Sequence, residues 1–349
     1  MDLIPIIERY LPAFRARYAG RITPAQESAL HAMLGCRTEQ YAEILLHCSA
    51  CDLPQSRFQS CGHRSCHRCQ HHDTTRWLER QRQKLLPVEY FMVTFTLPRQ
   101  LRSLAWHHQK DLYSLLFECA VSTLKDFGMN DKTLAADLGM TAVLHTHTRR
   151  LDYHPHLHIV VPGGGFNKKR RQWKKCRGKF LFNEFALAKV FRGRFLAALR
   201  DAGYALPPNT PTRWVANCKS VGKGLPALEY LSRYLYRGVI SENNIIDDNG
   251  SHVTFRYTDS SSGLIKPRTV TGEVFLWLLL QHVLPKGFRR VRDYGFLHGN
   301  AKSLLQKIQL LLRVVILHPP KKDRPSFKCC RCKQPVSMIG IRTPAGRSG

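Results

Sequence analysis

The stretch from Tyr153 to Val161, which reads YHPHLHIVV, restricts the fold of this chain more than any other feature. Successive side chains of a β-strand point to opposite faces, so this pattern places His154, His156 and His158 together on one face. Leu157 and the apolar residues at every second position after it then face a core. Two imidazoles two residues apart on one face can reach the same cation. The pattern therefore predicts a sheet that holds a metal ion against one side.

A stable metal site needs a third protein ligand. His145 lies on another predicted strand, Thr141 to Thr146, just before the histidine strand. Antiparallel pairing of the two strands would bring His145 beside the other histidines, and we take it as the third ligand. His147 and His154 are the alternatives.

A second informative stretch is EYLSRYLYR, from Glu229 to Arg237, within a helix expected over Ala227 to Arg237. Tyr230 and Tyr234 are four residues apart and share one helix face, while Arg233 and Arg237 share a neighbouring face. Two tyrosines at this spacing are usually core residues. A tyrosine hydroxyl is a weak nucleophile because its pKa is about 10, and it needs a phosphate polarised by a cation. The histidine strand would supply that cation, which makes both tyrosines candidate catalytic residues.

The charge of the chain points to a polyanionic partner. It has 54 Lys and Arg against 25 Asp and Glu, a net charge of +29, and nucleic acid is the usual partner of such a surplus. Basic residues concentrate in an expected helix from Arg76 to Leu86 and in a run from Lys168 to Lys179 that holds no acidic residue. Both could be solvated faces, but aromatic residues within and beside the run favour a surface for single-stranded DNA. The predicted DNA-binding residues are Arg233 and Arg237 of the tyrosine helix and, in these two basic stretches, Arg76, Arg80, Lys168, Lys169, Arg170 and Arg171.

No targeting or membrane-spanning segment is expected. The first residues lack the apolar stretch of a signal peptide, and the longest apolar stretch, Val274 to Leu284, has about half the length that a bilayer needs. We expect a cytoplasmic protein with no membrane partner. In a reducing compartment, clustered cysteines are more often metal ligands than disulfides.

Cys48, Cys51, Cys66 and Cys69 form two CxxC pairs with the spacing of a zinc ribbon. Cys36 and Cys61 are further possible zinc ligands, and His63 or His67 could substitute for a cysteine. A last CxxC, from Cys329 to Cys332, has no obvious partner pair and is either half of a zinc site or no site at all.

The remaining pattern predicts an α+β protein. One helix is expected from Leu3 to Tyr18, and a second helix is expected to begin after a cap at Thr23. Three more helices and three strands, in addition to the two histidine-bearing strands, are expected later in the chain. The later helices are Trp106 to Lys125, Phe185 to Arg200 and Val274 to Leu284. The further strands are Tyr90 to Leu97, Arg213 to Asn217 and Val253 to Tyr257.

These motifs resemble the HUH endonuclease superfamily, and more closely its two-tyrosine insertion-sequence transposases of the IS91 type. The resemblance rests on FTLP ending at Pro98, on VLHT and HPHLH followed by Gly163-Gly164-Gly165, and on YLSRY with Arg237. Further matches are VTFRY from Val253 and HVLPKGF from His282. His147 and Tyr236 depart from the family pattern, and Tyr236 falls off the catalytic face.

The resemblance implies an HUH core, a central antiparallel sheet flanked by helices, behind a helical and zinc-ribbon-like DNA-binding module. The expected division is 1–86 for that module, 87–270 for the catalytic domain and 271–349 for a basic C-terminal region. It also implies Mg or Mn at the histidines and zinc at the N-terminal cysteines, where His63 and His67 are not inherited ligands. Mn suits imidazole better than Mg does.

The implied activity is rolling-circle transposition in the cytoplasm of a bacterium, near the nucleoid. One tyrosine attacks single-stranded DNA at an element end or target site and forms a 5′-phosphotyrosine link; the second allows a further strand transfer. A plasmid replication initiator or relaxase would share this chemistry. A catalytically inactive zinc-dependent DNA-binding protein is the alternative of another class. A metal hydrolase would need acidic ligands, and only Asp152 is near.

Overall fold

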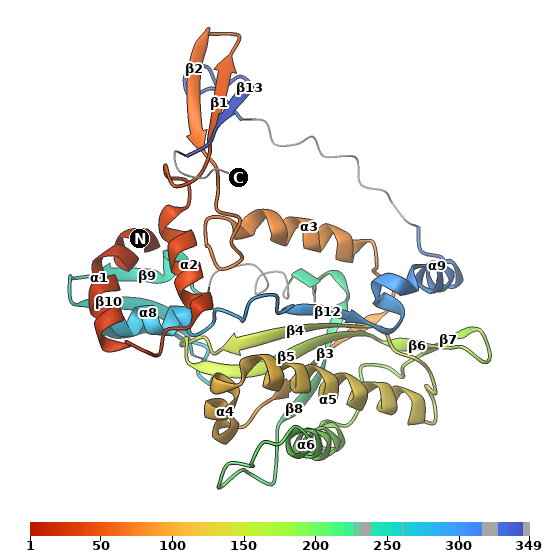
Figure 1. Cartoon of the computed structure of the whole chain (residues 1–349). Helices are drawn as coiled ribbons and strands as arrows, with labels where there is room; N and C mark the ends of the chain where they lie inside the picture. The colour runs from red at the N-terminus through yellow and green to blue at the C-terminus, as the bar shows by residue number, and fades with distance from the viewer. Residues whose placement is uncertain (227, 230–238, 260, 316–326, 345–349) are drawn as a thin grey trace.

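The computed structural model describes the chain except for residues 227, 230–238, 260, 316–326 and 345–349. Over the described residues it is an α+β protein, as the sequence predicts, with a central antiparallel sheet flanked by helices (Figure 1). None of the helices in these ranges is long and apolar enough to cross a membrane.

The central sheet has the strand order β12-β4-β5-β3-β8, and every neighbouring pair is antiparallel. The strands are β3 Glu89–Thr96, β4 Met140–His147, β5 Tyr153–Pro162, β8 Ala216–Lys223 and β12 Val291–Tyr294. β5 carries the histidines and lies in the middle of the sheet. It ends before Gly163, where a Cβ would come within 2.7 Å of the Glu89 carbonyl oxygen. Glycine thus allows the close approach that leads into the hairpin of β6 (Gly164–Asn167) and β7 (Gln172–Lys175).

The two faces of the central sheet have different layers (Figure 1). One face packs against helices α4 (Arg102–His107), α5 (Gln109–Asn130) and α6 (Glu184–Asp201). Leu157, Ile159 and Val161 are fully buried in this layer, which confirms the apolar face predicted for the histidine strand. Helices α3 (Gln70–Arg82) and α9 (Lys302–Leu311) contribute Trp77 and Ile308 to a second core on the other face.

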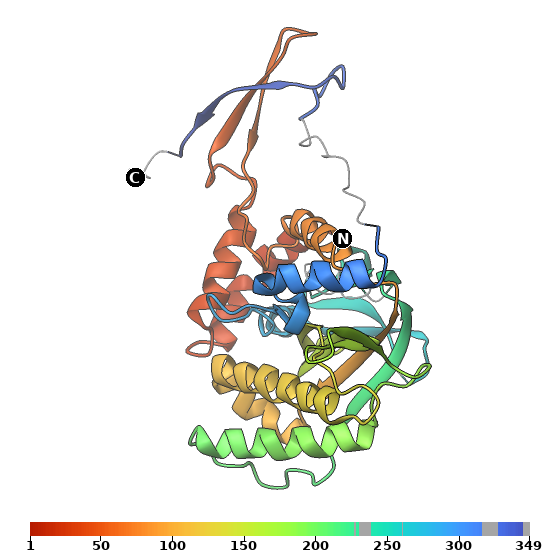
Figure 2. The same ribbon diagram turned by 90° about the vertical axis from the view of Figure 1, so that its right-hand side faces the viewer.

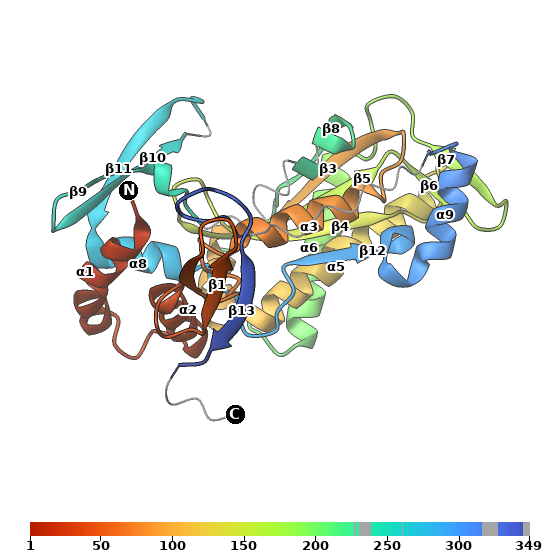
Figure 3. The same ribbon diagram turned by 90° about the horizontal axis from the view of Figure 1, so that it is seen from above.

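A second unit stands beside the central sheet (Figure 3). It combines α1 (Leu3–Arg17), α2 (Pro24–Gly35) and α8 (Gly272–Leu280) with the sheet β11-β10-β9. Those strands are β9 Ile245–Asp248, β10 His252–Thr258 and β11 Ile265–Thr271. Phe14 and Phe275 are fully buried in its core. Tyr10 donates a hydrogen bond of 2.6 Å to Asp248, which joins the start of the chain to β9.

A third sheet stands away from the rest of the molecule (Figures 1 and 2). Its order is β13-β1-β2, and both pairings are antiparallel. The strands are β1 Glu43–Cys48, β2 Leu53–Phe58 and β13 Ser337–Arg342. Among the described residues, the last strand in sequence therefore pairs with the first.

One expected helix start is confirmed, and two other expected elements differ in their bounds. Helix α2 follows Thr23, whose side chain accepts from the Gln26 amide in a full capping box, as the cap motif predicts. The single helix expected from Trp106 to Lys125 is two helices, because the backbone at His108 leaves the helical region (φ −124°, ψ 48°). The strand expected at Arg213 to Asn217 lies instead at Ala216–Lys223. The reason is that its pairing with β3 continues past Asn217, through Gly222, as far as Lys223.

Short 3-10 turns lie at Arg99–Leu101, Glu242–Asn244, Gly295–Leu297 and Gly299–Ala301. The helix expected over Ala227 to Arg237 lies almost wholly outside the described residues. The three-part division at residues 86 and 270 stays a prediction, and one core cluster joins α1, β10 and α8 across both positions.

Candidate functional site

Three histidines meet on the open side of the central sheet. In the antiparallel pairing of β4 and β5, His145 lies directly opposite His156, and His158 follows two residues on. The ring centroid of His145 is 4.4 Å from that of His158 and 5.2 Å from that of His156. One nitrogen from each ring lies within 4.8 Å of the other two. The structure thus brings the three predicted ligands together, close enough for one divalent ion.

Hydrogen bonds orient two of these rings. Nδ1 of His156 lies 2.7 Å from the carbonyl oxygen of His154, which can only accept, so this nitrogen carries the proton. Nδ1 of His158 lies 3.0 Å from the hydroxyl of Thr94 on β3. Nε2 of His156 therefore keeps a lone pair for an ion, and Nε2 of His158 does so when its Nδ1 donates to the Thr94 hydroxyl. Such outer partners are what fixes a metal-ligating histidine.

Burial keeps these imidazoles neutral. It lowers the pKa of His158 to about 3, with a smaller contribution from the nearby His156. The pKa of His156 is lowered for the same reason, and that of buried His145 lies well below its ordinary value. Neutral imidazole is the form that binds metal, so the cluster is ready to bind a cation at neutral pH.

The two alternative third ligands face other partners. The pairing of β4 and β5 is irregular between His145 and His147, so His147 leaves the register of the triad and lies 5.0 Å, centroid to centroid, from the ring of His282. His154 contacts the guanidinium of Arg102 through Nδ1. His145 is therefore the better placed third ligand. The Asp152 carboxylate accepts a hydrogen bond of 2.8 Å from Arg268 and is not part of the triad.

A cavity of about 620 Å³ opens over the triad. Its lining includes all three histidines, Arg149 and Arg256, and residues 239–241. A second cavity, on the β3 side, is lined by Thr94, His158, Lys219 and Pro226 among others. Tyr230, Tyr234, Arg233 and Arg237 lie outside the described residues. The residues that flank this segment on both sides therefore line cavities that contain His158.

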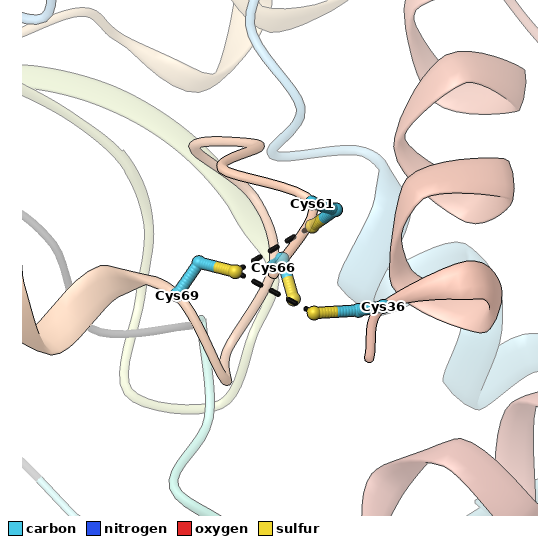
Figure 4. A group of neighbouring side chains, drawn as sticks. All are labelled: Cys36, Cys61, Cys66 and Cys69. Carbon is cyan, nitrogen blue, oxygen red and sulfur yellow. Dashed lines mark hydrogen bonds between the residues drawn. The ribbon is translucent and has the colours of Figure 1, made fainter. Parts of the chain in front are cut away.

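Four cysteines form a first tetrad (Figure 4). Cys36 follows α2, Cys61 and Cys66 lie in the loop after β2, and Cys69 precedes α3. The Cys69 sulfur is 3.5 Å from those of Cys36 and Cys61. A disulfide would need about 2.05 Å. Four zinc–sulfur bonds of about 2.3 Å in a tetrahedron would place the sulfurs about 3.8 Å apart, close to what is seen.

Burial raises the pKa of the Cys61 thiol to about 12 and raises that of Cys66 as well. Thiols in this state become thiolates at neutral pH only when a bound cation offsets the charge. The set is thus suited to a structural zinc ion.

The prediction that the two CxxC pairs share one ion is wrong. Cys66 and Cys69 belong to the tetrad with Cys36 and Cys61, whereas Cys48 and Cys51 meet Cys329 and Cys332 in a second tetrad. The reason is that β1 and β2 carry the first pair out to the third sheet, away from the loop that holds the second. All six N-terminal cysteines stay candidate zinc ligands. His63 and His67 belong to neither tetrad.

Those predicted DNA-binding residues that the structure describes lie on two separate elements. Arg76 and Arg80 are exposed on α3, on the same side of the central sheet as the histidines. Lys168, Lys169, Arg170 and Arg171 are exposed at the turn of the β6–β7 hairpin, which extends beyond the end of the sheet (Figure 1). The structure does not bring the two groups into one patch.

Two residues at the site were not singled out from the sequence. Thr94 orients His158, and Arg102 lies against His154. A signal for Thr94 was present: Thr94 and Thr96 are polar residues at alternate positions of an otherwise apolar strand. The sequence carries no such signal for Arg102, because Arg102 starts a helix that only the fold brings to the site.

Comparison with known proteins places the chain in a family. Residues 139–304 match a family model described as a putative transposase, and residues 6–97 match a transposase zinc-binding domain. A putative transposase, y4qJ, of Sinorhizobium fredii is 35% identical and covers 93% of this chain and 87% of its own length. The chain belongs to the IS91-type transposases. The transposase for insertion sequence element IS801 of Pseudomonas savastanoi pv. phaseolicola is also similar, at 26% identity over 83% of this IS91-type chain and 75% of its own.

Among solved structures, the IS91-type chain is similar to the conjugative relaxase TrwC. One of these structures holds a 27-mer DNA with the recognition hairpin and the cleavage site; it is 12% identical, covers 65% of this chain and 75% of its own, and has a TM-score of 0.28. A metal-bound complex with oriT DNA is 13% identical over 64% of this chain and 71% of its own, with a TM-score of 0.27.

Proposed function

We propose that this IS91-type transposase cleaves and rejoins single-stranded DNA through a 5′-phosphotyrosine link, with Tyr230 and Tyr234 as nucleophiles and His145, His156 and His158 as ligands of a divalent ion. The observation that carries the proposal is the position of the described residues on either side of the tyrosine segment. Pro226 before it and Val239 after it line the two cavities that contain His158. The chain therefore enters and leaves this segment beside the cavities that contain His158.

The donor set fits a divalent ion. Three neutral imidazoles leave room for oxygen ligands from water or phosphate, and imidazole suits Mn better than Mg. When bound, the ion would act as a Lewis acid toward the non-bridging oxygens of the scissile phosphate. Side chains of this protein make two further contributions. The hydrogen bonds at Nδ1 of His156 and His158 hold these rings in position. Arg149 and Arg256 give the cavity a positive lining for the DNA backbone.

The proposed reaction conserves the number of phosphodiester bonds. The tyrosine oxygen forms a bond to phosphorus, the bond from phosphorus to the 3′ oxygen breaks, and the phenolic proton ends on the 3′-hydroxyl. Because one phosphodiester replaces another, a free 3′-hydroxyl can reverse the step and rejoin a strand. A second tyrosine can accept another strand while the first link is intact.

The test is a covalent adduct. The full chain is incubated with Mn²⁺ and single strands that carry both ends of its own element, labelled at either the 5′ or the 3′ end. A 5′-phosphotyrosine link makes the 3′ label travel with the protein in denaturing gels and releases the 5′ label. The Y230F/Y234F variant should lose the adduct. Y236F, from the same segment, is the matched control and should keep it.

The remaining outcomes separate the alternatives. An adduct that persists in the double variant overturns the assignment of the nucleophiles. Absence of any adduct with Mn²⁺ or Mg²⁺, in a protein that still binds these strands, favours a non-catalytic zinc-dependent DNA-binding protein. H156A/H158A should abolish the adduct and leave DNA binding through the basic surfaces in place.

A further inference from the structure

The C-terminal cysteines have no part in the proposed transposase reaction. Cys329 and Cys332 lie beyond the matched regions, which end at residues 97 and 304. In the fold they lie beside Cys48 and Cys51, at the tip of the third sheet. The four sulfur atoms lie within 4.8 Å of one another.

We propose that Cys48, Cys51, Cys329 and Cys332 bind a second structural zinc ion, in a zinc ribbon assembled from the two ends of the chain. The sulfurs of Cys48 and Cys332, 284 positions apart in sequence, are separated by 3.6 Å. That distance is close to the value of about 3.8 Å expected between the sulfurs of a tetrahedral zinc site. It is far from the value of about 2.05 Å in a disulfide.

Each half of the tetrad has the same local design. Each half is a CxxC turn, Cys48 to Cys51 in one and Cys329 to Cys332 in the other. In the C-terminal half the backbone N–H of Arg331 donates to the Cys329 sulfur, at 3.4 Å. In both halves the first cysteine of the CxxC is buried and the second is partly exposed. Two matched turns that each present two sulfurs are the arrangement of a tetrahedral thiolate site.

The strands support the same assembly. β13 pairs with β1 from His47 opposite Ser337 to Glu43 opposite Arg342, where the two side chains form an ion pair of 3.1 Å. The backbone of Cys330 donates to the side chain of Gln55 on β2, at 3.3 Å. The C-terminal segment is thus hydrogen-bonded to both strands of the N-terminal hairpin. The zinc ion would hold the C-terminal segment against this hairpin, because it would take two ligands from each end of the chain.

Cys330 provides an internal control. It lies between the two C-terminal ligands in sequence, but it is exposed and is not part of the tetrad. A zinc site of this kind therefore predicts different behaviour for adjacent cysteines. It also predicts that loss of one end exposes the ligands at the other.

The experiment measures zinc content and cysteine alkylation in the purified, reduced full chain. After removal of weakly bound divalent ions, wild type and C330S should each hold two zinc ions per chain, and C329S/C332S should hold one. In wild type, mass spectrometry should find Cys330 alkylated fast and Cys48 and Cys51 protected. In C329S/C332S the protection of Cys48 and Cys51 should be lost, while Cys66 and Cys69 stay protected.

The reciprocal variant, C48S/C51S, should expose Cys329 and Cys332, which keeps the test valid if either double variant is poorly soluble. Two zinc ions retained in C329S/C332S would overturn the proposal, as would Cys48 and Cys51 that stay protected there. Equal loss of zinc in C330S would also overturn it. None of these readouts depends on DNA cleavage, so they stand apart from the test of the transposase reaction.

Discussion

The hydroxyl of Thr94 lies 3.0 Å from Nδ1 of His158, across the pairing of β3 with β5. If Nδ1 donates to this oxygen, Nε2 is the nitrogen that carries the lone pair for a metal ion. The contact therefore decides which nitrogen of His158 is available to a metal ion, although Thr94 does not touch the ion itself.

We expect the T94V variant to bind Mn²⁺ about 10- to 100-fold more weakly, the usual cost of losing the outer partner of a metal-bound histidine. Adduct formation should recover at saturating Mn²⁺, since the ligands are unchanged. The measurement is a Mn²⁺ titration of adduct formation beside direct calorimetric binding. T94S keeps the hydroxyl and should restore the affinity. A T94V variant with unchanged Mn²⁺ affinity would show that Thr94 has no orienting role.

The histidine site illustrates what the sequence could predict. The alternation of polar and apolar residues from Tyr153 to Val161 is a local property of a strand, and the buried face of Leu157 and Ile159 is as expected. The position of His145 opposite His156 needed only an antiparallel pairing through a short turn. The separation of His147 from the triad could not be predicted, because it depends on an irregularity in that pairing.

The cysteines show where prediction stops. A CxxC spacing says that two cysteines can share an ion, but it does not say which two pairs meet. That choice depends here on β13 pairing with β1, a contact between the two ends of the chain. No local pattern at Cys329 or Cys332 encodes its distant partner. The prediction therefore grouped the pairs that are nearest in sequence, Cys48–Cys51 with Cys66–Cys69.

The buried His282 should make stability depend on pH. Burial lowers its pKa to about 3, whereas a histidine in the unfolded chain has a pKa of about 6.5. The unfolded state therefore binds the extra proton, and stability that is complete above about pH 6.5 is lost as the pH falls toward the folded-state value. From pH 7 to pH 5 this one group should lower the free energy of unfolding by about 2 kcal/mol.

Denaturant unfolding in zinc-containing buffer, at half-unit steps from pH 5 to pH 8, measures this effect. In H282Q the slope between pH 5 and pH 6 should fall by about 1.2 kcal/mol per pH unit. The slopes of the two proteins should coincide between pH 7 and pH 8, which serves as the internal control. Equal slopes at acid pH would show that His282 does not control the pH dependence.

The β6–β7 turn should contribute DNA affinity and not chemistry. Lys169, Arg170 and Arg171 are exposed there, and roughly 30 Å of extended chain separates the turn from His158. Each phosphate contact on single-stranded DNA adds about 0.7 to the slope of log affinity against log salt, so the triple alanine variant should lower the slope by about 2. Its single-turnover rate at saturating DNA should stay that of wild type.

The matched control for this variant is K110A/K125A/K132A, which removes three exposed charges from α5 and the residues just after it, on the other face of the sheet. It should leave the salt slope unchanged. An equal fall in both variants would mean that only net charge matters. A lower saturated rate in the hairpin variant would place the turn near the scissile phosphate.

Arg102 should act on the scissile phosphate. Its guanidinium contacts Nδ1 of His154, and its Nε is buried without a hydrogen-bond partner among the described residues. A fixed cationic donor beside the triad is suited to an oxygen that gains charge during phosphoryl transfer, and loss of such a donor costs about 10²- to 10³-fold in rate. We therefore expect R102A to slow single-turnover adduct formation by about 10²-fold and to leave the Mn²⁺ affinity within a factor of about three of wild type. R102K, which keeps the charge but not the planar fork, should fall between R102A and wild type. The exposed neighbour Arg99 gives the control, since R99A should leave the rate unchanged. If excess Mn²⁺ restored the full rate of R102A, Arg102 would act through the metal site and not on the phosphate.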